Sequence, residues 1–247
     1  MRCGVSWTHV TLAAVAEPLP LVLIPGLLGS ARLYSPQIPA LWRLGAVMVA
    51  DHTRDDSMAG IARRILTSAP VRFALAGLSM GGYVAFEILR QAPERVAKLA
   101  LLDTSARPDT PEQSAGRRAQ MTHASQGRFA EVLAAQFLRL VGRARREDAA
   151  LRAVFNLMAE EVGVAAFLRQ QTAIIGRSDS RATLERIRCP TLVLVGEEDE
   201  ATPPERAGEI AQGIAGARLV TVPQCGHLST LEQPDEVTQA LLAWLRG

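Results

Sequence analysis

The chain has 247 residues, of which 48% are hydrophobic and 21% charged, and its formal net charge is +2. This length accommodates one large α/β domain or two small ones, and the balance of charges is that of an ordinary globular protein. The densest basic cluster, at 142–148, is short and ends in two acids, so we predict no nucleic-acid partner. No apolar run approaches the roughly 18 residues that a membrane span requires, so we predict no membrane partner.

The three cysteines, Cys3, Cys189 and Cys225, form no C-x-x-C pair and indicate neither a disulfide framework nor a zinc site. This usage favours a reducing cytoplasm. The segment VTLAAVA near the N-terminus ends like a signal-peptidase site, but the residues before it make a poor apolar region. We therefore expect an edge strand within residues 5–16.

Six short apolar runs, each bounded by Gly, Pro or charged residues, are typical of buried parallel strands. These runs are PLVLIPG (20–26), AVMVADH (46–52), VRFALAG (71–77), AKLALLD (97–103), PTLVLVGEED (190–199) and ARLVTVP (217–223). Helical patterns separate them, and this alternation predicts an α/β fold: a mostly parallel open sheet with helices on both faces. The predicted helices are at 56–66, 80–96, 203–214 and 234–247.

Residues 107–186 break the alternation, because they contain no strand candidate. They carry two apolar stripes at helical spacing, one from Phe129 to Leu140 and one from Leu151 to Val162. We predict a helical cap at 107–186, inserted into a core formed by residues 1–106 and 187–247.

The stretch AGLSMGGY contains the pattern G-x-S-x-G around Ser79, directly after a predicted strand and before a predicted helix. In such a turn the serine adopts a strained backbone conformation, and Gly77 and Gly81 relieve the crowding on either side. A dinucleotide-binding loop would need glycine at position 79, and a phosphate-binding P-loop would need lysine at position 83, which is Tyr83. A serine that only caps the following helix remains an alternative for this motif taken alone.

A serine nucleophile needs a base, and the base needs a carboxylate that orients it. Asp199 and His227 each follow the end of a predicted strand, where parallel sheets place their sites. The order Ser, acid, His is that of α/β-hydrolases.

Together these segments resemble the α/β-hydrolase superfamily, in particular its compact esterase-like members with a short helical cap. The resemblance runs from Pro20 to the C-terminus and is carried by IPGLLGS (24–30), GLSMGG (77–82), VGEEDEATPP (195–204) and QCGHLSTLEQP (224–234). It implies Ser79 as nucleophile, His227 as general base and then acid, and Asp199 as its partner. It also implies an oxyanion hole formed by the backbone N–H groups of Leu27 and Met80.

Rivals exist for the acid and the base. Asp103 is an acid position that some relatives use, and Glu197, Glu198 and Glu200 flank Asp199, although the G-x-x-D-x-x-T-P spacing selects the aspartate. His9, His52 and His123 are interpreted as surface or supporting histidines. Cys225 is interpreted as a small buried residue.

The chain departs from the family pattern in two places. Pro25-Gly26 stands where many relatives have His-Gly before the oxyanion residue, and the N-terminal hairpin is shortened.

The expected activity is hydrolysis of a small or medium carboxylic ester or thioester through an acyl-enzyme, with no metal or organic cofactor. Two alternatives are a lyase or other C–C bond-processing enzyme with the same triad, and a non-enzymatic binding module. In the lyase alternative, cap arginines such as Arg128, Arg139 or Arg169 bind a carboxylate. The predicted pocket for a small-molecule acyl substrate is lined by Leu28, Phe129, Phe137, Met158 and Leu228.

Overall fold

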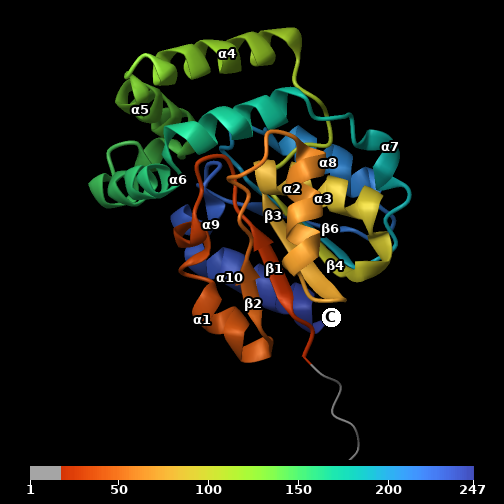
Figure 1. The fold of residues 1–247 in the computed structure, drawn as a ribbon. Helices are drawn as coiled ribbons and strands as arrows, with labels where there is room; N and C mark the ends of the chain where they lie inside the picture. The colour runs from red at the N-terminus through yellow and green to blue at the C-terminus, as the bar shows by residue number, and fades with distance from the viewer. Residues whose placement is uncertain (1–17) are drawn as a thin grey trace, which may run out of the picture.

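The computed structural model describes residues 18–247, so the strand expected within residues 5–16 lies outside the described part, as do Cys3 and His9. Six parallel strands form one sheet in the order β2-β1-β3-β4-β5-β6 (Figure 1). The strands are β1 (Leu21–Ile24), β2 (Val47–Val49), β3 (Phe73–Leu78), β4 (Val96–Leu102), β5 (Thr191–Gly196) and β6 (Arg218–Val222). Each strand lies within one of the six predicted runs or one residue beyond it, and the predicted α/β fold is confirmed.

Both faces of the sheet are buried, which explains why its central strands are continuously apolar. In β1, Leu21 and Leu23 belong to one hydrophobic cluster, whereas Val22 and Ile24 belong to the other. Helices α1 and α10 complete the first cluster, and helices α2, α3 and α8 complete the second (Figure 1). The sheet is therefore the middle layer of three.

The helices cover most of the segments between strands. They are α1 (Ile38–Leu41), α2 (Met58–Ser68), α3 (Met80–Gln91), α4 (Pro111–Ser125), α5 (Phe129–Leu140), α6 (Ala149–Ile175), α7 (Arg181–Leu184), α8 (Pro204–Gly213), α9 (Ser229–Glu232) and α10 (Pro234–Arg246). Short 3₁₀ helices occur at Ala31–Tyr34, Trp42–Leu44, Pro93–Arg95 and Arg143–Arg145.

The helix predicted at 80–96 is shorter in the structure. Helix α3 ends at Gln91, and a 3₁₀ turn at Pro93–Arg95 leads into β4. Pro93 accounts for the difference, because proline has no N–H to donate and disfavours helical geometry at the residue before it.

Along the chain, helices α4 to α7 come between β4 and β5. Helices α4, α5 and α6 lie beyond the carboxyl ends of the strands (Figure 1). Helix α6 is interrupted at Gly163, whose φ of 75° lies in the left-handed region. Helix α4 was not indicated by an apolar stripe, because Ala124 is its only buried residue. Among residues 18–247, no helix is long and apolar enough to cross a membrane.

The order of the strands creates a crevice at this edge of the sheet. From β1 the chain moves outward to β2, whereas from β3 it moves in the opposite direction to β4. Loops that leave neighbouring strands in opposite directions open a crevice at the carboxyl ends of those strands. The loops after β1 and β3 flank this crevice, and they contain Leu27 and Ser79.

Candidate active site

Ser79 occupies a strained turn between β3 and α3. Its φ of 55° and ψ of −115° are outside the regions favoured by L-residues with a side chain. A Cβ on Gly77 would lie 2.3 Å from the carbonyl oxygen of Gly81, and one on Gly81 would lie 2.1 Å from that of Ile24. Both positions therefore require glycine, as the sequence motif predicts.

The turn exposes the serine and little else. From residue 73 to residue 86 every residue is buried except Ser79. Ser79 and His227 line the same cavity, which has a volume of about 340 Å³. Its other walls come from the loop after β1 and from helices α4, α5 and α6.

Asp199 holds one nitrogen of the His227 ring. Oδ2 of Asp199 lies 2.7 Å from Nδ1 of His227, and both side chains are almost completely buried. The same carboxylate accepts hydrogen bonds from the hydroxyl of Thr202 at 2.8 Å and from the backbone N–H groups of Ala201 and Thr202 at 2.8 and 2.9 Å. Nε2 is thus the ring nitrogen that is free of this carboxylate.

The electrostatics of the pair agree with its geometry. Burial acts to raise the pKa of Asp199, but the neighbouring charge of His227 and the hydrogen bonds from His227 and Thr202 hold this pKa below its ordinary value. Burial acts to lower the pKa of His227, but the Asp199 carboxylate raises it above its ordinary value of 6.5. An aspartate and histidine in this arrangement can take a proton from a hydroxyl beside the ring.

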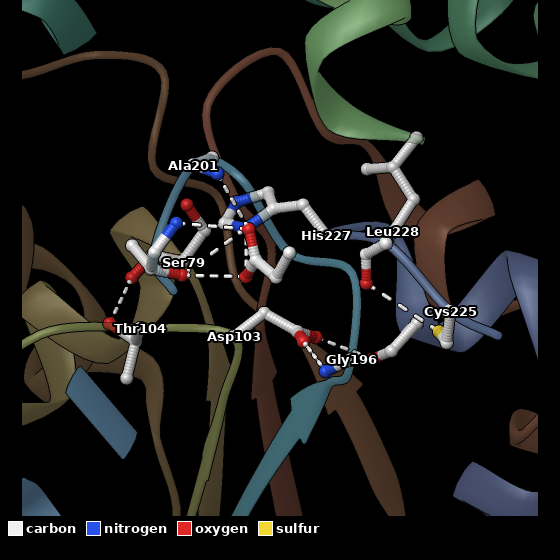
Figure 2. Close-up of polar contacts among 12 residues, drawn as sticks. Ser79, Asp103, Thr104, Gly196, Ala201, Cys225, His227 and Leu228 are labelled. Atoms are coloured by element: carbon white, nitrogen blue, oxygen red, sulfur yellow. Dashed lines mark hydrogen bonds and ion pairs between the residues drawn. The ribbon is translucent and has the colours of Figure 1, made fainter. Parts of the chain in front are cut away.

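Asp103, the rival acid, is fully buried and bound elsewhere. Its carboxylate accepts a hydrogen bond from the backbone N–H of Gly196 at 2.9 Å (Figure 2). It accepts another from the hydroxyl of Ser229. Burial, and next the charge of Asp199, raise the pKa of Asp103 well above its ordinary value. Asp103 therefore has two partners of its own, and neither is the imidazole of His227.

The three glutamates beside Asp199 have other partners. Glu198 accepts the backbone N–H of Arg143 at 2.8 Å, Glu200 pairs with Arg146 at 3.1 Å, and Glu197 accepts the backbone N–H of Gln224 at 3.2 Å. Among the four neighbouring acids, Asp199 alone is bonded to His227.

The candidate oxyanion loop lies directly against Ser79. A Cβ on Gly26 would be 3.3 Å from the Cβ of Ser79, so the backbone of this loop lies in contact with the serine. Leu27 is the next residue of the loop and lines the same cavity as Ser79. Met80 is the first residue of α3, and its N–H has no acceptor within that helix. Leu28, in the same loop as Leu27, has a φ of 62°, so this loop is also strained.

Two buried polar side chains support this loop, and neither was singled out as a site residue from the sequence. Oε1 of Gln170, in α6, accepts the backbone N–H of Leu28 at 3.2 Å. The amide nitrogen of Gln170 lies 3.1 Å from Nε2 of His52, which lies 2.9 Å from the carbonyl oxygen of Gly26. Only the tertiary structure brings Gln170 to the loop, since the two are separated by more than half of the chain.

Glu232 holds the loop that carries His227. Its carboxylate accepts the backbone N–H groups of Gly226 at 3.1 Å and Leu228 at 3.0 Å, on either side of the histidine. It also accepts the N–H of Gly142 at 2.7 Å, which ties the loop to the segment after α5. The only sequence signal for this role is its place in the motif that contains His227.

Three of the predicted pocket residues, Leu28, Met158 and Leu228, line the cavity. Phe129 and Phe137 do not. Phe137 is fully buried and packs against Phe155 with ring centroids 5.8 Å apart, and Phe129 packs against Phe167 at 5.4 Å. Phe137 belongs to the hydrophobic core and the half-buried Phe129 packs against it, because the apolar stripe of α5 faces inward.

Of the three arginines considered as carboxylate ligands, Arg139 lines the cavity. The other two point elsewhere, because Arg128 donates to Gln126 and Arg169 donates to the carbonyl oxygen of Thr53. His123 is exposed on α4 and does not line the cavity.

Comparisons with known proteins identify the family to which the chain belongs. The chain is 29% identical over 187 residues to the pimeloyl-[acyl-carrier protein] methyl ester esterase of Nitrosomonas europaea, which covers 73% of this chain and 74% of the relative. A thermophilic esterase from Thermogutta terrifontis, solved with malate bound, is 30% identical, with a TM-score of 0.85 over 93% of this chain and 90% of that one. A hydrolase from Pseudomonas aeruginosa PA01 is 29% identical, with a TM-score of 0.84 over 94% of this chain and 91% of that one. The sequence profile of the alpha/beta hydrolase family matches residues 5–240, and the chain belongs to this family.

Proposed function

We propose that this protein is a serine hydrolase that cleaves a small or medium carboxylic ester or thioester through an acyl-enzyme. The observation that carries the proposal is a single cavity shared by Ser79, on its strained turn, and His227, whose Nδ1 is held by Asp199 at 2.7 Å. Fold alone does not define a reaction, so the proposal rests on these side chains.

In the proposed reaction, Oγ of Ser79 attacks the carbonyl carbon while Nε2 of His227 accepts the hydroxyl proton. The backbone N–H groups of Leu27 and Met80 stabilise the oxyanion of the tetrahedral intermediate, and each such donor is typically worth about 3 to 4 kcal/mol. His227 then gives its proton to the leaving alcohol or thiol. A water molecule, activated by the same histidine, hydrolyses the acyl-enzyme and restores Ser79.

Residues 107–186 would act as a cap over a core formed by residues 1–106 and 187–247. In support, α4, α5 and α6 all contribute side chains to the walls of the cavity. A volume of about 340 Å³ is at the small end of ligand pockets and favours a small or medium substrate.

Two relatives support ester hydrolysis as the reaction class. The Nitrosomonas protein is a methyl ester esterase and the Thermogutta protein is an esterase, at 29% and 30% identity. Identity at this level favours ester hydrolysis as the reaction class of this chain. The substrate itself is determined by the residues that line the cavity.

The proposal is tested with short p-nitrophenyl esters and a fluorophosphonate probe on the full chain. Wild-type protein is expected to hydrolyse the esters and to be labelled at Ser79, and Ser79→Ala is expected to lose both activities. Ser68→Ala, at the end of α2 and away from the cavity, is the matched control. Undiminished ester turnover by Ser79→Ala would overturn the proposal, and labelling without turnover of any ester would favour the lyase alternative.

A further inference from the structure

One of the charged side chains that line the cavity, Arg139, has no ion-pair partner among residues 18–247. Three permanently charged or acidic side chains other than His227 line it, namely Glu112, Arg117 and Arg139. Arg117 is paired with Asp109 at 2.7 Å and also donates to Gln171 at 2.9 Å. Glu112 lies in the first turn of α4, where its own backbone N–H and the hydroxyl of Thr110 lower the pKa of its carboxyl. The side chain of Arg139 is exposed at the rim and makes no ion pair or hydrogen bond with any residue from 18 to 247.

The position of Arg139 relative to His227 is set by the backbone. Arg139 is in the last turn of α5, and the carbonyl oxygen of the next residue, Leu140, accepts the backbone N–H of His227 at 2.7 Å. The guanidinium is near enough that its charge opposes protonation of the His227 ring. A group bound by Arg139 would therefore lie within the same small cavity as the reacting serine.

Two neutral polar side chains, Gln120 and Gln136, line the cavity together with Arg139. The amide of Gln136 donates to Gln120 at 3.0 Å, and the amide of Gln171 donates to the same oxygen at 2.9 Å. Of the two arginines that line the cavity, Arg117 is already paired with Asp109, so Arg139 is the one that is available to bind an anion. A guanidinium binds a carboxylate through two parallel hydrogen bonds, a geometry that an ammonium group does not reproduce.

We infer that the ester substrate of this site carries a carboxylate remote from its scissile bond, and that Arg139 binds it. The inference rests on the proposed ester hydrolysis and narrows it to half-esters of short dicarboxylic acids or esters of similar charge. A different role is available to Arg139, because a cation in the last turn of a helix interacts favourably with the helix dipole. In that role Arg139 would affect stability without affecting the choice of substrate.

The test compares monomethyl succinate, glutarate and adipate with methyl butyrate, valerate and hexanoate of the same chain lengths. Wild-type protein is expected to prefer the charged member of at least one pair in kcat/KM. Arg139→Gln is expected to lower that charged-to-neutral ratio of kcat/KM about tenfold. A hydrogen bond to a charged group at an exposed site typically contributes about this factor to binding. Arg139→Lys is expected to retain part of the preference, and Arg118→Gln, an exposed arginine of α4 outside the cavity, all of it. The preference is also expected to weaken as salt is added.

A binding measurement separates this inference from the proposed reaction. Calorimetry with Ser79→Ala and monomethyl adipate needs no turnover, and the additional change Arg139→Gln is expected to weaken binding about tenfold. If wild-type protein hydrolyses esters but the charged-to-neutral ratio is the same in Arg139→Gln, the inference is overturned and the proposed function stands. If no ester is turned over and Ser79 is not labelled, the proposed function fails, whatever the binding result.

Discussion

Nδ1 of His227 lies 2.7 Å from Oδ2 of Asp199, whereas the carboxylate of Asp103 is bound to Gly196 and Ser229. This relationship distinguishes between two acids that both follow a strand of the sheet. Asp199→Asn is expected to lower kcat by about 10⁴, the loss typical when the acid of such a triad becomes an amide. Asp103→Asn is expected to change kcat by less than about tenfold, and to act mainly on thermal stability. Steady-state kinetics and thermal unfolding of the two variants check this, and equal losses of kcat would contradict it.

The pH dependence of kcat/KM follows from the raised pKa of His227. The ring must be neutral to accept the proton of Ser79, so activity is lost as the pH falls through the pKa of His227. Because Asp199 raises this pKa above 6.5, the acidic limb of the profile is expected above pH 6.5.

Asp199→Asn removes the charge that favours the protonated ring, so the acidic limb of its residual activity is expected at lower pH. The profiles are measured with a neutral ester, so that ionisation of the substrate does not contribute. A limb that stays in place in Asp199→Asn would assign the titration to another group.

Gln170 connects helix α6 to the loop that contains Leu27. Gln170→Met keeps the approximate size of the side chain but leaves the buried N–H of Leu28 without its acceptor. An unsatisfied buried donor costs about 1 to 3 kcal/mol, which the loop can avoid by moving away from its present position. We expect kcat to fall about tenfold with little change in KM, because a displaced loop weakens binding of the oxyanion more than binding of the substrate.

The matched control for Gln170 is Gln171→Met, one residue further along α6. Gln171 is equally buried, but its partners Gln120 and Arg117 both belong to α4. Gln171→Met is expected to lower thermal stability, but not to cause the fall in kcat that is expected for Gln170→Met. The rate of inactivation by a fluorophosphonate gives a second readout, and equal rates in wild type and Gln170→Met would exclude a positioning role.

Glu232 is expected to stabilise the fold and the position of His227 together. Glu232→Ala leaves three buried backbone donors, at Gly142, Gly226 and Leu228, without their acceptor. We expect the free energy of unfolding to fall by about 2 to 4 kcal/mol and kcat to fall with it. Glu236→Gln, on the exposed side of α10, is expected to change stability by less than about 0.5 kcal/mol. Chemical denaturation of both variants measures the difference.

Much of the fold can be predicted from local sequence. Alternate residues of strands such as β1 enter the hydrophobic clusters on opposite faces of the sheet, so a buried strand must be apolar throughout. The elbow around Ser79 is equally local, because Gly77 and Gly81 have no room for a Cβ. Helix α4 was missed for the opposite reason, since a helix that buries little more than Ala124 has no apolar stripe to recognise.

The sequence by itself determined the order of the strands along the chain, the turn that presents Ser79 and the pair Asp199 and His227 as candidates, because each depends on residues adjacent in the chain. Only the tertiary structure decided that Asp199 rather than Asp103 contacts His227, that Phe137 is in the core rather than on the cavity, and that Gln170 and Glu232 hold the two loops. These contacts join segments far apart in sequence. Their geometry depends on how helices pack on the sheet, and no local pattern encodes that packing.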